Sequence, residues 1–208
     1  MLVDMHLHEK TYSLDSFQDL ANMVETAKSR GLDAICITDH DSMGLKNFAE
    51  EYSKKIGFPI FVGVEYFSLQ GDITAFGIDS FPSERISAQD FVNYVLEQGG
   101  VCFSCHPFRN NNRGLKEKLK EVKGLTGVEV LNGSTPENDN KKAFEYCTKL
   151  GLMPIGASDA HDLNQLGKYA TWFPNKVNTL NDFVAEIKKG ISKAAIFDGN
   201  KYKVVEYI

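Results

Sequence analysis

The chain has 208 residues, of which 42% are hydrophobic and 25% are charged, and this composition excludes a disordered chain, a collagen-like fibre and a disulfide-stapled miniprotein. Its 23 basic and 28 acidic residues leave a net charge of −5, which weighs against a long nucleic acid as partner. No apolar run approaches the roughly 20 residues that cross a bilayer, and we see no export signal, so we expect a cytoplasmic protein without a membrane partner.

Short β-branched runs alternate with segments of helical period, a pattern typical of βα units around a mostly parallel sheet. The first half of the chain predicts strands, helices and one hairpin, at residues 2–6 (strand), 16–31 (helix), 34–38 (strand), 45–56 (helix), and 59–69 with 73–78 (hairpin). We expect Ser16 to cap the first of these helices and Gly71 with Asp72 to form the turn of the hairpin.

The second half of the chain continues the alternation. Ser87 is expected to cap a helix over residues 87–100, and Pro136 to begin another that ends at Gly151. Further strands are predicted at residues 101–105, 128–131, 154–157, 169–173 and 194–197, with a last helix from about residue 180. No internal repeat and no dividing linker is visible, so residues 1–208 are expected to form one α/β domain. Its strands could form an open doubly wound sheet or a barrel, which would be short because a full eight-fold barrel takes about 250 residues.

All five histidines follow predicted strands. They lie at the carboxyl end of a strand or in the loop directly after it, at positions 6, 8, 40, 106 and 161. A single histidine in such a place is readily a surface or core residue, but five equivalent placements are harder to explain by chance. Ligands and catalytic groups gather on this rim in both barrels and open α/β sheets. The histidines therefore predict a functional site there.

Two of the spacings have a direct physical meaning. On a strand, His6 and His8 project to one face about 6–7 Å apart, so both imidazoles can reach one metal ion or a neighbouring pair, and Asp159 and His161 share a face for the same reason. The candidate ligands that converge are His6, His8, His40, Glu65, His106, Asp159 and His161. This set favours Zn, Mn or Fe in a catalytic site, and its size indicates two or three divalent metals with Glu65 and Asp159 as bridges.

The chain has four cysteines, as a reducing compartment permits. Cys102 and Cys105 form a C-x-x-C, which could be a redox or zinc pair. They lie within a predicted buried strand, where residues three apart face opposite sides. We therefore expect two small buried side chains rather than a pair.

The motifs resemble those of the PHP family, named for polymerase and histidinol phosphatase. The residues that carry the resemblance are Asp4-x-His6-x-His8, Thr38-Asp39-His40, Gly63-Val64-Glu65, His106-Pro107 and Ser158-Asp159-x-His161. The resemblance covers nearly the whole chain and is strongest to short single-domain phosphoesterases of the family. It implies a distorted (β/α)7 barrel with a trinuclear metal cluster at the C-terminal rim of the strands. It also implies a metal-dependent phosphoesterase whose substrates are small phosphorylated metabolites or nucleotides.

Two positions depart from the family pattern. Many relatives carry an acid five residues after the second histidine of the first motif, where this chain has Ser13, and Asp15 is the candidate ligand instead. Many also have a histidine in the hairpin where this chain has Asp72, which is either an oxygen ligand favouring a harder metal such as Mn or a plain turn residue. Asn132 is a candidate ligand or substrate contact, or an ordinary turn residue before Gly133.

For the reaction, we expect a metal-bound hydroxide to attack phosphorus in line, with the ester oxygen leaving on the opposite side. Arg109, in the loop after the fourth motif, is expected to bind a phosphate oxygen, and Arg113 could do the same or be a solvated surface charge. Asp39 and Asp41 flank His40 and could orient ligands. One of these two, or Asp15, could protonate the leaving group.

Several alternative functions remain open from the sequence. Within the family, they are a histidinol-phosphate phosphatase and an exonuclease. A metal-dependent amidohydrolase also begins with H-x-H, but it typically carries a metal-bridging lysine on a middle strand, where this chain offers Glu65. A non-catalytic metal-binding domain would have no need of so many ligands.

Overall fold

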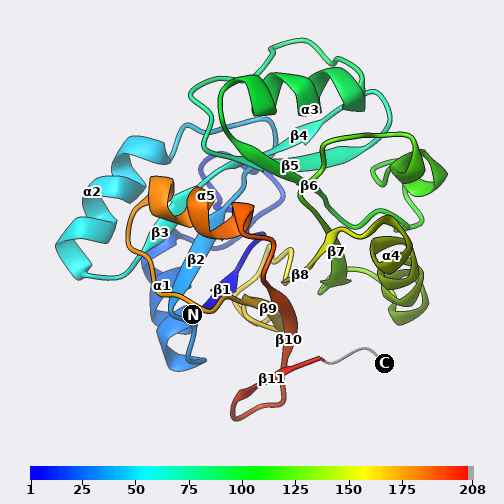
Figure 1. Ribbon diagram of the computed structural model, residues 1–208. Helices are drawn as coiled ribbons and strands as arrows, with labels where there is room; N and C mark the ends of the chain where they lie inside the picture. The colour runs from blue at the N-terminus through cyan, green and yellow to red at the C-terminus, as the bar shows by residue number, and fades with distance from the viewer. Residues whose placement is uncertain (206–208) are drawn as a thin grey trace.

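The strands of this computed structural model, which describes residues 1–205, form two sheets (Figure 1). The first sheet has the order β11-β10-β9-β1-β2-β3, and its strands are β1 Leu2–Asp4, β2 Ala34–Ile37, β3 Ile60–Val62, β9 Tyr169–Trp172, β10 Lys193–Phe197 and β11 Tyr202–Val204. The second has the order β4-β5-β6-β7-β8, and its strands are β4 Val64–Phe67, β5 Asp72–Phe76, β6 Val101–Ser104, β7 Gly127–Asn132 and β8 Met153–Ala157.

Helices pack against the strands of both sheets and make the fold mixed α/β, as the sequence predicts. They are α1 Leu20–Ser29, α2 Lys46–Ile56, α3 Ala88–Glu97, the 3-10 helix η1 Lys116–Lys120, α4 Glu137–Leu150 and α5 Leu180–Lys188. α1 contacts β2, α2 contacts β3, α3 contacts β5 and β6, and α4 contacts β7, so each sheet has its own helical cover (Figure 1). Within residues 1–205, no helix combines the length and apolar character that a membrane span requires.

Both sheets are mixed rather than mostly parallel. β1, β2 and β3 run parallel, as do β6, β7 and β8, but β5 is antiparallel to both of its neighbours and β9 is antiparallel to β1 and β10. The predicted hairpin, now β4 and β5, is confirmed. The hydrogen-bonded strands of the described chain do not close into the expected barrel. Two isolated bridges, His40 with Glu65 and Leu7 with Ala160, instead join the sheets.

The strand predicted over residues 59–69 is divided at Gly63, with β3 in the first sheet and β4 in the second. A Cβ at Gly63 would lie 2.3 Å from the carbonyl oxygen of Ala75 and 2.6 Å from the ring of Phe76. Only glycine allows the chain to approach β5 so closely at this point. The division sends Glu65 into the second sheet, where its backbone meets that of His40 across the seam.

Hydrogen bonds at the helix starts both confirm and correct the predicted caps. The Ser87 side chain accepts from the Asp90 N–H, as expected for the cap of α3. α1 begins later than predicted, because Asp19 is its N-cap and accepts from the Asn22 N–H. Ser16 does not cap the helix, and its hydroxyl donates to the carbonyl of His8 at 2.7 Å. This bond folds the segment before α1 back onto the end of β1.

The buried interior changes character along the strands. Phe61, Phe173 and Phe183 pack in one aromatic cluster, in which the Phe61 and Phe183 rings stack with centroids 4.2 Å apart. Toward the ends of β1, β4, β7 and β8 the interior becomes polar, with residues no more than 1% exposed at Asp4, His6, His8, Glu65, Glu129 and Asp159. Charged groups are rarely buried unless they are paired or bind a cation, so this end of the fold carries the candidate site.

Candidate metal centre

The structure brings the predicted ligand residues to one place. A cavity of about 200 Å³ opens where the two sheets meet, and its lining residues are Asp15, His40, Glu65, Asp72, His106, Arg109, Asn111, Arg113, Asp159 and His161. His6 and His8 are fully buried beside it. A larger cavity of about 460 Å³, between α2 and the start of α5, is lined by none of these residues and by no histidine.

The deepest group of side chains follows β1 and β8. The Nε2 atoms of His6 and His8 lie 3.0 Å apart, and Asp159 Oδ1 lies 3.2 Å from His8 Nε2 and 3.6 Å from His6 Nε2. Glu65 Oε1 is 3.5 Å from His6 Nε2. Two ring nitrogens and two carboxylates thus face one small volume, as the spacing of His6 and His8 predicts.

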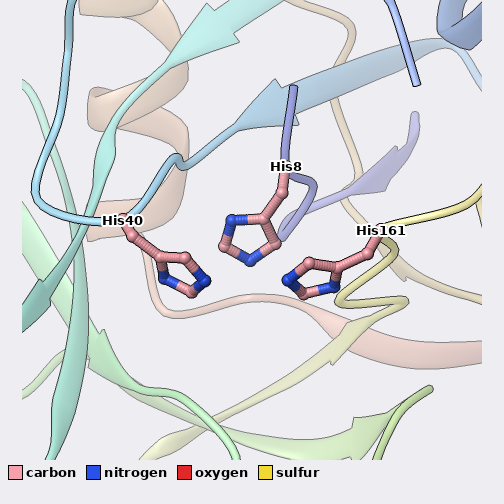
Figure 2. A group of neighbouring side chains, drawn as sticks. All are labelled: His8, His40 and His161. Atoms are coloured by element: carbon pink, nitrogen blue, oxygen red, sulfur yellow. The ribbon is translucent and has the colours of Figure 1, made fainter. Parts of the chain in front are cut away.

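A second group consists of three imidazoles, His8, His40 and His161. Figure 2 shows them arriving from three separate segments with their rings turned toward one another, and one nitrogen of each lies within 4.8 Å of the others. The ring of His8 lies between the other two, with centroid distances of 4.2 Å to each. Asp15 completes the group, because its Oδ2 is 3.2 Å from His40 Nε2 and 3.3 Å from His161 Nε2.

A third group is formed by Glu65, Asp72 and His106. His106 Nε2 lies 2.8 Å from Glu65 Oε1 and 3.7 Å from Asp72 Oδ2. Asp72 is the first residue of β5 and fully buried, so it is not a solvated turn aspartate. Its Oδ2 accepts from Arg113 Nε at 2.6 Å, whereas its Oδ1 is buried without a hydrogen-bond partner among the described residues.

These observations test whether divalent cations fit the site. Buried carboxylate oxygens in folded proteins nearly always have a partner, and Asp72 Oδ1 has none. The donor atoms are imidazole nitrogens and carboxylate oxygens, which suit Mn, Fe and Zn. Within each of the groups His6/His8/Asp159, His8/His40/His161 and Glu65/Asp72/His106, these atoms lie within 4.8 Å of one another. The residues present therefore fit divalent cations.

The charges in the site shift several pKa values strongly. Burial raises the pKa of Asp72 to about 7, and the negative charge of Glu65 adds to this shift. Burial would also raise the pKa of Glu65 and of Asp159, but the charge of His6 and hydrogen bonds from neighbouring histidines hold both well below the usual range. Burial lowers the pKa of His8 to about 4. The site thus holds at least two carboxylates that stay negative at neutral pH.

Proton competition predicts how cation binding depends on pH. Asp72, with a pKa of about 7, is protonated below that pH, and His40, whose pKa burial lowers but Glu65 and Asp15 raise to about 9, stays protonated at neutral pH. A cation must displace these protons, so affinity for Mn²⁺ is expected to rise between about pH 6 and 8, by up to about tenfold per unit for each proton displaced. Calorimetric titration of the wild type and of Asp72→Asn measures this. The variant should bind more weakly with a shallower slope, and equal slopes would contradict the assignment.

Backbone strain gathers at the same place. Four residues other than glycine have positive φ in the described chain, and two of them are site residues, His106 at 31° and Asp159 at 49°. A third, Asp41 at 45°, directly follows His40. Such conformations cost of order 1–3 kcal/mol and persist only where surrounding contacts enforce them. Contacts around the site therefore hold the backbones of His106 and Asp159 in these unfavourable conformations, which fixes where their side chains lie.

The three residues expected to be catalytic occupy different places. Arg109 lines the cavity, donates from Nη2 to Asn132 Oδ1 at 2.7 Å and contacts Asp159. Asp15 also lines the cavity. Asp39 does not, because its buried carboxylate accepts from Glu9 N–H at 2.7 Å and from Ser13 Oγ at 2.8 Å. Asp39 therefore lies behind His8, which contacts the same Ser13 hydroxyl, and not against a substrate.

Asn132, a candidate ligand or substrate contact from the sequence, donates to both Glu129 and Asp159. Its partner Glu129 was not predicted as a site residue; it is fully buried, with Oε1 2.8 Å from His6 Nδ1. The available signal was a charged residue inside an otherwise apolar predicted strand. Cys102 and Cys105 are buried free thiols, as expected, but the Cys105 thiol also lies 3.5 Å from Glu65 Oε1.

Comparison with known proteins bears on the class. Residues 137–191 match a family model described as PHP-associated. An uncharacterized protein of Methanocaldococcus jannaschii is 25% identical over 141 residues, which are 64% of this chain and 82% of that relative. A PolC-type DNA polymerase III of Thermotoga maritima is 25% identical over 183 residues, which are 78% of this chain but 13% of the polymerase. The chain therefore spans a small part of that polymerase.

Among solved structures, one from Bifidobacterium adolescentis, named as a metal-dependent phosphoesterase, has the same fold with a TM-score of 0.67. It is 19% identical, and the match covers 90% of this chain and 96% of that one. The fold and the buried imidazoles and carboxylates at the strand ends define a mixed α/β protein with a candidate metal centre. The ordered motifs, the family model over residues 137–191 and the match to the polymerase together support a protein of the PHP family.

Proposed function

We propose that this chain is a metal-dependent phosphoesterase that hydrolyses a phosphate ester of a small metabolite or nucleotide. The observation that carries the proposal is the convergence of five imidazoles, Glu65, Asp72 and Asp159 on a cavity that two arginines also line. A structural cation site would need fewer ligands and no open cavity. The name of the Bifidobacterium adolescentis protein with the same fold agrees with this chemistry.

Two or three divalent cations, Mn, Zn or Fe, are the proposed cofactors. The candidate ligands are His6, His8, Asp15, His40, Glu65, Asp72, His106, Asp159 and His161. Divalent cations at such sites lower the pKa of a bound water toward neutrality and neutralise the charge of a phosphoryl group. Glu65 contacts histidines of all three groups and Asp159 contacts the deepest pair, so these carboxylates are the proposed bridges.

Arg109 and Arg113 are the proposed phosphate-binding residues. Both line the cavity, and a guanidinium group matches two phosphate oxygens in one plane. Arg113 Nε is 2.6 Å from Asp72 Oδ2, and Arg109 contacts Asp159. Both guanidinium groups therefore already lie against carboxylates of the candidate centre. Asp15 suits a ligand better than a proton donor, because His40 and His161 lower its pKa although burial opposes them.

The proposal extends to the architecture. The His40 bridge joins the end of β2 to β4, and the Leu7 bridge joins the segment after β1 to the segment after β8. With these two seams, β1, β2, β4, β5, β6, β7 and β8 follow one another around a ring, which we take to be the distorted seven-stranded barrel expected from the sequence. One domain spanning the chain accounts for a site built from both sheets.

Phosphate release from a panel of phosphomonoesters and nucleotides, including histidinol phosphate, tests the function. The assay uses added Mn²⁺, with Asp159→Asn as the inactive variant and Asp79→Asn, an exposed aspartate, as the matched control. Release by the wild type and the control, abolished in Asp159→Asn, is expected. No release from any panel member by protein with bound Mn²⁺ would reject the phosphomonoesterase, and diesters, single-stranded oligonucleotides and amides would be assayed next.

Removal of one proposed phosphate-binding side chain should lower kcat/KM more than it lowers the metal content of the protein. In Arg109→Ala, kcat/KM for the best substrate is expected to fall by about 10- to 100-fold, because charge-assisted hydrogen bonds contribute about 1.5–3 kcal/mol. Mn²⁺ content, measured on the same samples, should stay near the wild-type value. Arg85→Ala, an exposed arginine outside the cavity lining, is the control. Loss of Mn²⁺ with unchanged kcat/KM per bound metal would show that Arg109 supports the centre rather than the phosphate.

A further inference from the structure

β7 carries an irregularity beside the site. Its Glu129 pairs with Ile155 of β8, and its Leu131 pairs with the next residue, Gly156, so Val130 is an extra residue in β7. In a regular strand, positions 129 and 132 would face opposite sides. The β-bulge turns them to one side, and Asn132 Nδ2 donates to Glu129 Oε2 at 2.8 Å. Two polar side chains of one strand thereby reach the same buried space.

Every group around the Glu129 carboxylate is a donor. Oε2 accepts from the backbone N–H of His106 at 2.9 Å as well as from Asn132 Nδ2. The orientation of the Asn132 amide is fixed, because its Oδ1 accepts from the Ser134 N–H and from Arg109 Nη2. Oε1 faces His6 Nδ1 at 2.8 Å. A carboxylate has only acceptors to offer, so His6 must donate from Nδ1.

This hydrogen bond decides what His6 presents to the cavity side. With the proton held on Nδ1, it is Nε2 that is available as a ligand, and Nε2 is the atom near Glu65 and Asp159. The same carboxylate fastens the backbone of His106, whose φ of 31° is strained. Glu129 thus contacts two candidate ligands that come from different sheets.

We infer that Glu129 is a positioning residue of the metal centre, which fixes the Nδ1–H form of His6 and the backbone of His106 and depends on the β7 bulge to reach both. The inference rests on the proposed function and deepens it, because a carboxylate behind a metal-binding imidazole raises metal affinity. Glutamine cannot replace this carboxylate. A glutamine side chain has one oxygen and one NH₂ group. The NH₂ group would therefore face either His6 Nδ1 or the two donors to Oε2, which are the His106 N–H and Asn132 Nδ2.

The test compares Glu129→Gln with Glu186→Gln, which alters a buried glutamate of α5 that accepts from Asn175 away from the site. Calorimetry on metal-free protein measures Mn²⁺ affinity, and thermal unfolding measures stability. Nuclear magnetic resonance of protein labelled with ¹⁵N-histidine measures the hydrogen-bonded Nδ1–H of His6, which a His6→Asn spectrum assigns. Asn132→Ala removes a donor to Oε2 and should leave the His6 signal in place.

We expect Glu129→Gln to lose or shift the His6 Nδ1–H signal and to bind Mn²⁺ about 10- to 100-fold more weakly, while Glu186→Gln matches the wild type in both. An unchanged signal and unchanged affinity in folded Glu129→Gln would overturn the inference, even if stability falls. If Glu129→Gln does not fold, the spectrum of the wild type tests the inference. Absence of a hydrogen-bonded Nδ1–H signal from His6 in that spectrum would reject the role of Glu129. A wild type that binds no divalent cation rejects the proposed function, and the His6 signal still decides the role of Glu129.

Discussion

Replacement of Glu65 by glutamine is expected to lower phosphate release by at least about 1,000-fold, equivalent to about 4 kcal/mol of transition-state stabilisation. Glu65 is the side chain that links the three groups of candidate ligands, because it lies 2.5 Å from His40 Nδ1, 2.8 Å from His106 Nε2 and 3.5 Å from His6 Nε2. Its pKa is held well below the usual range by His6 and its other neighbours, although burial opposes them, so it supplies a permanent negative charge. The neutral amide removes that charge from the centre.

Phosphate release and metal content are measured together on Glu65→Gln, the wild type and Glu50→Gln. Glu50 is an exposed glutamate of α2 that pairs with Lys54, so its variant should retain both activity and metal. A Glu65→Gln protein with full metal content and activity within about tenfold of the wild type would contradict the bridging role. Loss of a carboxylate shared between metal ions should reduce activity by much more than tenfold.

Removal of divalent cations is expected to lower thermal stability strongly. A ligand that binds only the folded state at about 1,000 times its dissociation constant adds about 4 kcal/mol. For a chain of this size, that corresponds to a rise in Tm of about 8–16 °C. One physical reason is the repulsion between the buried carboxylates of Glu65 and Asp72, which a bound cation would neutralise.

Differential scanning calorimetry after chelation, and again after addition of Mn²⁺, measures this change. Mn²⁺ should restore the Tm of the wild type and have little effect on Glu65→Gln, which serves as the control. A wild-type Tm that does not respond to chelation or to Mn²⁺ would mean that the protein holds no stabilising cation, and the proposed cofactors would then be wrong.

The meeting of these residues could be predicted because it follows from local rules. Extended-chain alternation predicts one face for His6 and His8, which lie just beyond β1, and the ends of neighbouring strands place His40, His106 and His161 on one rim. Asp72 shows the limit of such rules. A turn and the first residue of a strand look alike in sequence, whereas the structure buries this carboxylate at the start of β5 beside His106.

The features that could not be predicted depend on contacts between distant segments. Gly63 divides a strand because of its approach to Ala75 and Phe76, which lie on another strand. Glu129 and Asn132 share a side because β8 pairs with β7 out of regular register. In both cases, the hydrophobic pattern of one strand contains no information about the neighbouring strand that changes its course or its register. Asp39 is similar, since its partners Glu9 and Ser13 lie on a loop that precedes it by about a whole βα unit.

The two isolated bridges have a consequence for how the protein opens. His6, His8 and His40 follow strands of the first sheet, whereas Glu65, His106 and Asp159 lie on or follow strands of the second, so the candidate centre straddles both seams. A single bridge lacks the adjoining ladder of a continuous sheet, and separation at a seam needs less energy than unfolding of either sheet. A cation held by ligands from both sheets, as proposed above, would oppose this separation. Amide hydrogens at the seams should therefore exchange slowly in the loaded protein and quickly in the empty one, while those inside each sheet change little.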